Sequence, residues 1–270
     1  MKYLSSPNNP ELKRLRLLFQ KSRERKKQGF FVIEGAREIE KAIIGGYELE
    51  SIFIKEGYES INSKIQITSN EVFSFCIKKS VFEQISIRSG SEKVIAIAKN
   101  KIHKLELLNL SGNGIVLVIE APEKPGNIGA IFRTAAAAKL NSIIIANPNT
   151  DFYNPNTIRS SLGSIFLVPT AIAPSFEVIT YLKKNEYEIL TAVINADAIL
   201  YNKYDYKKPC AIVIGSESNG LSNLWLEASD KHLIIPMHNS IDSLNLSVSA
   251  GILMYEAQSR NNKLEKKTIL

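Results

Sequence analysis

Residues 235–257 read IPMHNSIDSLNLSVSAGILMYEA, and this stretch decides how the end of the chain folds. It begins like the apolar end of a strand and finishes like a helix that starts near Leu246. Between these parts, serine and asparagine alternate with Leu244, Leu246 and Val248. Serine and asparagine are common helix caps, but one cap needs only one such residue. The additional polar residues, Asn245 among them, therefore indicate a second role for this segment.

The chain before this stretch alternates apolar strands with helices from residue 114 onward. Residues 114–121, GIVLVIEA, are rich in β-branched side chains, which suits a strand buried on both faces. Further strands are predicted between helices, one of them at 165–169, IFLVP. Such alternation implies a parallel sheet with covered faces. We therefore predict a parallel-sheet α/β domain over residues 114–260 and a flexible tail over 261–270.

A smaller α/β unit is predicted for residues 1–100, and a polar linker at 101–113 joins it to the larger domain. Its predicted strands lie at 29–35, 48–56, 63–69 and 93–99. A basic helix precedes them, with Asn9 as its cap and Pro10 at its first position. Lysine and arginine are dense between residues 13 and 27, beside an apolar stripe. Such a face is either simply solvated or binds phosphates.

The composition excludes several classes of protein. With 270 residues, of which 44% are hydrophobic, the chain can form two domains with real cores. It has no apolar run near the roughly 18 residues of a membrane span, and its N-terminus lacks a signal peptide's apolar core. Two isolated cysteines and three scattered histidines predict neither a disulfide nor a metal site. We expect a cytoplasmic protein, and its net charge of +7 favours an anionic partner.

Three loops that follow strands of the predicted parallel sheet carry polar residues. Ligands bind beyond the carboxyl ends of the strands in such sheets. The loops contain Asn127, Arg133, Glu217, Ser243 and Asn245. None of them has a Rossmann, Walker or nucleophile-elbow motif. Each residue alone also fits a cap, a turn or the surface, so the functional prediction rests on their occurrence together.

The three loops together resemble one family, the SpoU or TrmH-type RNA 2′-O-ribose methyltransferases of the SPOUT superfamily. The resemblance is carried by PGNIGAIFRTAAAA at 125–138, IVIGSESNGLS at 212–222 and the stretch at 235–257. NPNTIRSSLGSIFLVP at 154–169 also matches a feature of the family. The chain departs from the family pattern at Asn239, where glycine is frequent. Asparagine tolerates unusual backbone angles, so we expect the loop to be preserved.

The resemblance implies a C-terminal deep trefoil knot that binds S-adenosylmethionine, and a homodimer through the last helix. The implied cofactor-binding residues are Ala192, Gly215, Gly220, Ile235, Met237, Leu244 and Asn245. The implied catalytic residues are Arg133, Asn127, Glu217, Ser243 and Asn245. The family proposal makes Arg133 the general base. An arginine ordinarily keeps its proton, so this side chain can instead clamp a phosphate and stabilise a developing alkoxide.

The resemblance also implies where RNA binds. Residues 1–100 resemble the family's RNA-binding domain, which folds like ribosomal protein L30. The predicted RNA-binding residues are Lys13, Arg14, Arg16, Arg23, Arg25 and Arg159. This architecture favours 23S rRNA as the substrate. The alternatives are an RNA-binding or ribosome-assembly protein without catalysis, a tRNA 2′-O-methyltransferase, and an rRNA methylase that confers antibiotic resistance.

Overall fold

The structure is a computed structural model that describes residues 1–61, 65, 72–86, 92–110, 114–195, 197–206 and 209–261. It contains two compact units. The first comprises Met1–Ile102 and Asp151–Leu167, and the second comprises His103–Thr150 and the chain from Val168 onward. Most of the strand predicted at 63–69, the last three residues of the predicted linker and nearly all of the predicted tail lie outside the described residues. In the part of the chain that the structure describes, no helix is long and apolar enough to cross a bilayer.

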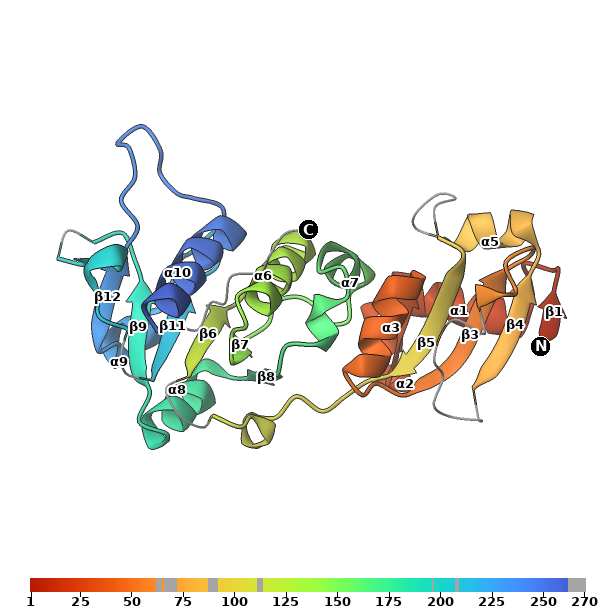
Figure 1. The fold of residues 1–270 in the computed structure, drawn as a ribbon, viewed down its shortest axis with the longest axis horizontal. Helices are drawn as coiled ribbons and strands as arrows, with labels where there is room; N and C mark the ends of the chain where they lie inside the picture. The colour runs from red at the N-terminus through yellow and green to blue at the C-terminus, as the bar shows by residue number, and fades with distance from the viewer. Residues whose placement is uncertain are drawn as a thin grey trace. The chain divides into compact units, whose positions relative to one another are not determined.

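The first unit is built on a mixed sheet with strand order β1-β4-β3-β5-β2 among the described residues (Figure 1). Its strands are β1 (Lys2–Leu4), β2 (Phe30–Glu34), β3 (Leu49–Lys55), β4 (Phe73–Ile77) and β5 (Val94–Lys99). Its helices are α1 (Pro10–Gln20), α2 (Ser22–Gln28), α3 (Ala36–Ile44), α5 (Lys79–Ile85), α7 (Pro155–Ser160) and the 3-10 helix η2 (Ser164–Phe166). β1 and β3 run parallel to β4, whereas β5 pairs antiparallel with β2 and β3.

The predicted basic helix is confirmed at its start but is interrupted at Lys21. Asn9 caps α1, because its Oδ1 accepts a hydrogen bond of 2.9 Å from the amide of Glu11, and Pro10 occupies the first helical position. The apolar stripe of α1 is buried at Leu12, Leu15, Leu18 and Phe19. Lys21 is extended, with φ −118° and ψ 108°, and α2 begins at the next residue. The basic segment therefore forms two helices rather than one.

Residues 151–167 belong to the first unit, although the strands on either side of them in sequence belong to the second. The ring of Tyr153 stacks on that of Phe31, with centroids 4.1 Å apart. The Lys41 ammonium donates a hydrogen bond of 2.7 Å to the carbonyl of Leu162. The strand predicted at 165–169 is wrong: η2 occupies part of this segment, and the next strand begins at Thr170. Ring packing and a helical turn have overridden the apolar pattern there.

The second unit contains a parallel sheet with strand order β10-β12-β9-β11-β6-β7-β8 (Figure 1). Its strands are β6 (Ile115–Glu120), β7 (Ser142–Ala146), β8 (Thr170–Ala173), β9 (Glu188–Ala192), β10 (Ile199–Leu200), β11 (Cys210–Ile214) and β12 (Lys231–Ile234). All of these strands pair in parallel. β6 and β11 are neighbours within the sheet, and every one of their residues is buried. The predicted parallel-sheet α/β fold is confirmed.

Helices cover both sides of this sheet. The second unit contains α6 (Pro125–Ala137), α8 (Ser175–Lys184), α9 (Asn223–Ala228), α10 (Leu246–Arg260) and the 3-10 helices η1 (Leu105–Leu107) and η3 (Tyr201–Lys203). α6 and α10 pack on each other and lie on one side of the sheet, whereas α8 lies on the other and contacts α9 (Figure 1). Because the strands are parallel, the loops after β6, β9, β11 and β12 meet at one edge.

Candidate active site

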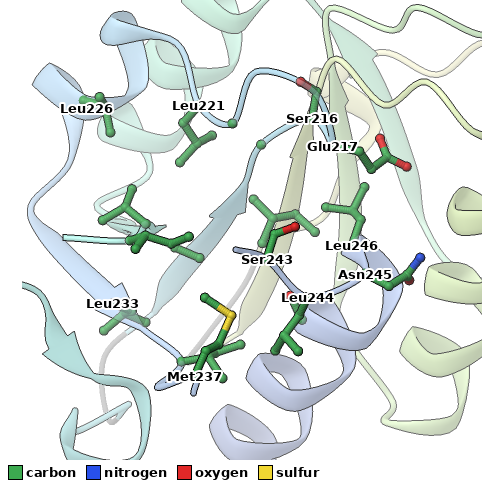
Figure 2. A pocket seen from close by; sticks show the side chains of 18 of the residues that line it. Ser216, Glu217, Leu221, Leu226, Leu233, Met237, Ser243, Leu244, Asn245 and Leu246 are labelled. Carbon is green, nitrogen blue, oxygen red and sulfur yellow. The ribbon is translucent and has the colours of Figure 1, made fainter. Parts of the chain in front are cut away.

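A cavity of about 570 Å³ opens at this carboxyl edge (Figure 2). Its walls come from the ends of β9, β11 and β12, from the loops that follow them and from the start of α10. It is lined by all of the residues predicted for the cofactor: Ala192, Gly215, Gly220, Ile235, Met237, Leu244 and Asn245. The volume falls within the range of about 300–1,000 Å³ that is common for small-molecule sites.

The two sides of the cavity differ in chemistry. Leu226, Leu233 and Met237 lie on one side, and Glu217 and Asn245 lie on the other (Figure 2). An apolar wall suits the face of an aromatic ring, and polar side chains suit charged or hydroxylated groups. The cavity therefore fits a ligand with one flat apolar part and one polar part.

Three predicted residues from three different loops form one hydrogen-bonded cluster. The Asn127 amide donates to Glu217 Oε1 at 2.5 Å, and the Asn245 amide donates to Asn127 Oδ1 at 3.2 Å. The second carboxylate oxygen of Glu217 is buried and has no hydrogen-bond partner among the described residues. A buried oxygen of this kind needs a donor, and a ligand in the cavity can supply one. The structure thus brings three of the predicted catalytic residues together.

Asn245 explains the polar run that precedes α10. Its Oδ1 caps the helix by accepting hydrogen bonds from the amide of Ser247 at 2.9 Å and from the Ser247 hydroxyl at 2.7 Å. Its Nδ2 bonds to Asn127 at the same time. Leu246 is buried and Leu244 lines the cavity. The alternating pattern thus combines a helix cap, a core contact and a cavity wall.

The loop after β11 is closed on itself by hydrogen bonds. Ser216 and Gly220 exchange two backbone hydrogen bonds of 3.0 and 3.1 Å, and the amide of Asn219 donates to the Ser216 hydroxyl at 3.1 Å. A Cβ at Gly215 would lie 2.1 Å from the carbonyl carbon of Gly220, and Gly220 itself has a φ of +66°. Glycine is needed at both positions for this reason.

Arg133 and Ser243 are available to a ligand. Both residues are exposed, and Arg133 lies on α6 six positions after Asn127. Within the described part of the chain, neither the Arg133 guanidinium nor the Ser243 hydroxyl has a hydrogen bond or an ion pair. Ser243 lines the cavity. The described residues also contain no group of three or more histidine, cysteine, aspartate or glutamate residues placed to hold a metal.

The residues predicted to bind RNA fall into two groups. Lys13, Arg23 and Arg159 are exposed, and Arg16 is half-buried with a hydrogen bond of 3.3 Å from Nη1 to the carbonyl of Pro7. The Arg14 guanidinium instead holds the carboxylate of Glu50 through two bonds of 2.5 and 3.1 Å.

Arg25 requires a correction. It is 3% exposed and its Nε donates to Asp151 Oδ2 at 2.6 Å. Its Nη1 donates to the carbonyls of Leu18 and Phe19. Arg25 therefore packs inside the first unit and does not present its charge to a ligand. The charge pattern of α2 could not show this, because the partner Asp151 is 126 positions away in sequence.

Some residues of the cavity were not predicted. They include Lys124, Ile194, Leu226, Leu233, Leu246 and Ser249. Lys124 directly precedes the motif that contains Asn127, so its place in the sequence could have indicated that it lines the cavity. Leu226 and Leu233 look like ordinary core residues in sequence, and only the tertiary structure places them at the cavity.

Comparison with known proteins covers both units. Residues 114–255 match the SpoU rRNA Methylase family, and residues 9–96 match the MRM3-like substrate binding domain. The 23S rRNA (guanosine(2553)-2'-O)-methyltransferase RlmP of Bacillus subtilis (strain 168) is 27% identical over 255 residues, which cover 94% of this chain and 98% of the relative. The 23S rRNA (uridine(2479)-2'-O)-methyltransferase of Streptomyces viridochromogenes is 26% identical over 258 residues, with coverages of 92% and 89%.

Solved structures are similar over nearly the same length. A crystal structure of an RNA 2'-O ribose methyltransferase is 34% identical, with a TM-score of 0.82 and coverage of 96% of this chain and 99% of that one. The AdoMet-bound rRNA methyltransferase from Sinorhizobium meliloti is 26% identical, with a TM-score of 0.87 and coverages of 98% and 99%.

Proposed function

The chain belongs to the SpoU rRNA Methylase family, and on that premise we propose that it transfers a methyl group from S-adenosylmethionine to a ribose 2′-hydroxyl of 23S rRNA. The enzyme is an RNA 2′-O-ribose methyltransferase. The observation that carries the proposal is the hydrogen-bonded cluster of Asn127, Glu217 and Asn245 beside the cavity. Relatives named as 23S rRNA 2′-O-methyltransferases support the choice of RNA.

The cavity fits S-adenosylmethionine. Leu226, Leu233 and Met237 offer an apolar wall for an adenine ring, and backbone at Gly215 and Gly220 lines the same space. The Glu217 oxygen that lacks a hydrogen-bond partner among the described residues offers an acceptor on the polar side. When bound, this cofactor supplies a methyl group on a sulfonium centre. The sulfonium is already a good leaving group, so transfer of the methyl group needs no metal.

The residues of the chain have to place the ribose 2′-oxygen in line with that methyl group and help to remove the proton of the 2′-hydroxyl. We assign the orientation of the ribose to the connected amides of Asn127 and Asn245, which Glu217 holds in place. Arg133 is exposed and carries no internal ion pair among the described residues, so its guanidinium is free to clamp an RNA phosphate and to stabilise the developing alkoxide. Ser243 lies at the wall of the same cavity.

We further propose that residues 1–100 bind the RNA and that residues 114–260 form the methyltransferase domain. The match of residues 9–96 to a substrate binding domain supports the first assignment. The exposed cations Lys13, Arg23 and Arg159, with half-buried Arg16, are the proposed phosphate contacts. Arg14 can contribute only through the part of its guanidinium that Glu50 leaves open.

The trefoil knot, the homodimer and the cytoplasmic location are further parts of the proposal. α10 contacts α6, β6 and β11, which is the packing expected of a C-terminal segment inserted into the domain. α10 also keeps apolar side chains exposed at Val248 and Tyr255, as expected of a helix that meets a second subunit. Light scattering of the purified protein tests the dimer.

The test of the function is methyl transfer from labelled S-adenosylmethionine to total rRNA and tRNA from a strain that lacks the protein. We expect wild type to label large-subunit rRNA at a ribose and Arg133→Ala to lose roughly a hundredfold in rate. Lys184→Ala, which removes another exposed cation of the second unit, is the control and should label like wild type.

Two other outcomes would replace the proposal. If no variant labels RNA while all of them bind it, the chain is a non-catalytic RNA-binding protein. If label enters tRNA and not rRNA, the chemistry stands and the substrate changes.

A further inference from the structure

Hydrogen bonds between side chains of residues 120–127 and the loop after β11 join these two segments at three points, which differ in burial. At the cavity, Asn127 donates to Glu217. At the exposed rim, the Ser218 hydroxyl donates to Glu123 Oε1 at 2.6 Å. The third junction is buried and links Glu120, the last residue of β6, to Ser222. Only the first of these junctions belongs to the site described above.

Glu120 is 5% exposed, and its carboxylate accepts three hydrogen bonds. Its Oε2 accepts from the amide of Ser222 at 2.8 Å, and its Oε1 accepts from the Ser222 hydroxyl at 2.7 Å. Oε1 also accepts from the hydroxyl of Ser175, at the start of α8, at 3.2 Å. Hydrogen bonds to a buried carboxylate are stronger than bonds between neutral groups or bonds exposed to water. This carboxylate therefore fixes Ser222 more firmly than the rim contact fixes Ser218.

The Ser175 hydroxyl can only donate to Glu120, so Glu120 must be the acceptor of this hydrogen bond. The Ser175 hydroxyl oxygen already accepts from Trp225 Nε1 at 3.0 Å and from Asn147 Nδ2 at 2.8 Å. Asn147 is oriented in turn, because its Oδ1 accepts from the amide of Ser175 at 3.2 Å. With both lone pairs of the hydroxyl in use, its proton goes to Glu120. A group at position 120 that donates toward Ser175 would find no acceptor there.

Ser222 stands where the closed loop of residues 215–220 leaves the cavity. Its carbonyl accepts from the amides of Trp225 at 3.0 Å and Leu226 at 3.2 Å, so it also begins α9. Leu226 and Leu221 line the apolar side of the cavity, and Glu217 lies on the polar side (Figure 2). Fixing Ser222 therefore sets the position of both sides of the cavity relative to β6.

We propose that Glu120 is a positioning residue that holds the loop at 215–222 in the shape that binds the cofactor. The identity of the ligand, S-adenosylmethionine, rests on the function proposed above. The effect of Glu120 on the loop does not rest on that function, because the hydrogen bonds of Glu120 to Ser222 exist in the ligand-free protein. Glu120 acts through Ser222 and does not itself line the cavity.

The test compares Glu120→Gln with Glu123→Gln. Both substitutions replace a carboxylate by an amide of the same shape, at the end of β6 and in the loop that follows it, but Glu123 is exposed and its contact is at the rim. In Glu120→Gln, the amide NH₂ faces the Ser222 N–H, which is itself a donor, or it takes the place of Oε1. In the second case the saturated Ser175 oxygen offers it no acceptor, and the Ser222 hydroxyl has to turn from donor to acceptor. We expect amide hydrogen exchange of residues 215–222 in the ligand-free protein to become about tenfold faster. The Kd for S-adenosylmethionine, from calorimetric titration, is expected to rise by about tenfold as well.

Glu123→Gln is expected to change neither measurement. Ser222→Ala is the second variant if Glu120→Gln does not fold, and it is expected to act in the same direction. Ser175→Ala removes one bond to Glu120 and the acceptor of Trp225 Nε1, so it should lower the melting temperature. It leaves both bonds from Ser222 to Glu120 in place, so exchange at 215–222 should stay close to that of wild type.

The outcomes separate the two proposals. Unchanged exchange at 215–222 in Glu120→Gln, or exchange that rises equally throughout the second unit, overturns the positioning role. Faster exchange confined to the loop, in a protein whose wild type binds no S-adenosylmethionine, supports the positioning role and overturns the proposed function.

Discussion

Arg25→Ala is predicted to destabilise the first unit without removing an RNA contact. The Arg25 side chain is 3% exposed and bonds to Asp151 at 2.6 Å, to the Leu18 carbonyl at 2.6 Å and to the Phe19 carbonyl at 3.1 Å. Those carbonyls belong to the last turn of α1, which has no donors of its own for them. Alanine would also leave the carboxylate of Asp151, 10% exposed, without this partner. Removing one partner of a buried ion pair costs about 3–5 kcal/mol in the free energy of unfolding.

Urea unfolding followed by circular dichroism measures this loss. With a denaturant slope of about 2 kcal/mol per molar urea, the midpoint of the first unit falls by about 2 M. Arg23→Ala is the matched control, because Arg23 lies on the same helix and is exposed. We expect it to change the free energy of unfolding by less than about 0.5 kcal/mol. Unlike Arg25→Ala, it is expected to weaken RNA binding.

A third substitution sharpens the comparison. Arg25→Lys keeps the positive charge but cannot donate in several fixed directions at once, so we expect an intermediate loss of stability. The reasoning is refuted if Arg25→Ala has the same urea midpoint as wild type and lowers RNA affinity as much as Arg23→Ala does. That pattern would place the Arg25 charge at the surface.

Three more predictions concern the cofactor loop, the RNA surface and alkaline stability. Gly215→Ala is expected to abolish S-adenosylmethionine binding in calorimetric titration, because the added Cβ would lie 2.1 Å from the carbonyl carbon of Gly220; unchanged affinity would show that the loop adapts. Lys13→Ala is expected to lower the slope of log affinity for 23S rRNA against log salt by about 1, measured by filter binding, and an unchanged slope would exclude a phosphate contact. Burial raises the pKa of Tyr47 from 10.0 to about 12, so folding favours its protonated form. The stability that the protonated form provides is complete below pH 10.0 and is lost as the pH rises toward about 12. The urea midpoint of Tyr47→Phe should therefore fall less over that pH interval than the urea midpoint of wild type.

The features that the sequence predicted correctly depend on neighbours in sequence. Asn9 and Pro10 mark the start of α1, because a cap and a first-turn proline act on residues two or three positions away. The β-branched run of β6 predicted a strand buried on both faces, and its residues are all buried. Parallel strands bring their carboxyl ends to one edge, and Asn127, Glu217 and Asn245, which were predicted in loops after such strands, are bonded together there.

The predictions that failed depend on partners far away in sequence. Arg25 looks like a member of a basic surface until Asp151 is placed beside it. Residues 165–169 have the composition of a strand, but part of this segment forms η2 in the first unit. Charge and β-propensity at such positions are weak compared with a buried ion pair or the packing of several rings.

By itself, the sequence determined the alternation of strands and helices, the caps and the loops whose polar residues meet at the carboxyl edge. Each of these follows from local hydrogen bonding or from a hydrophobic period of a few residues. Only the tertiary structure decided that Arg25 is buried against Asp151 and that Glu120 holds Ser222. The physical reason is that a buried charge is tolerated only where its partners converge in space, and their distance along the chain carries no information about that convergence.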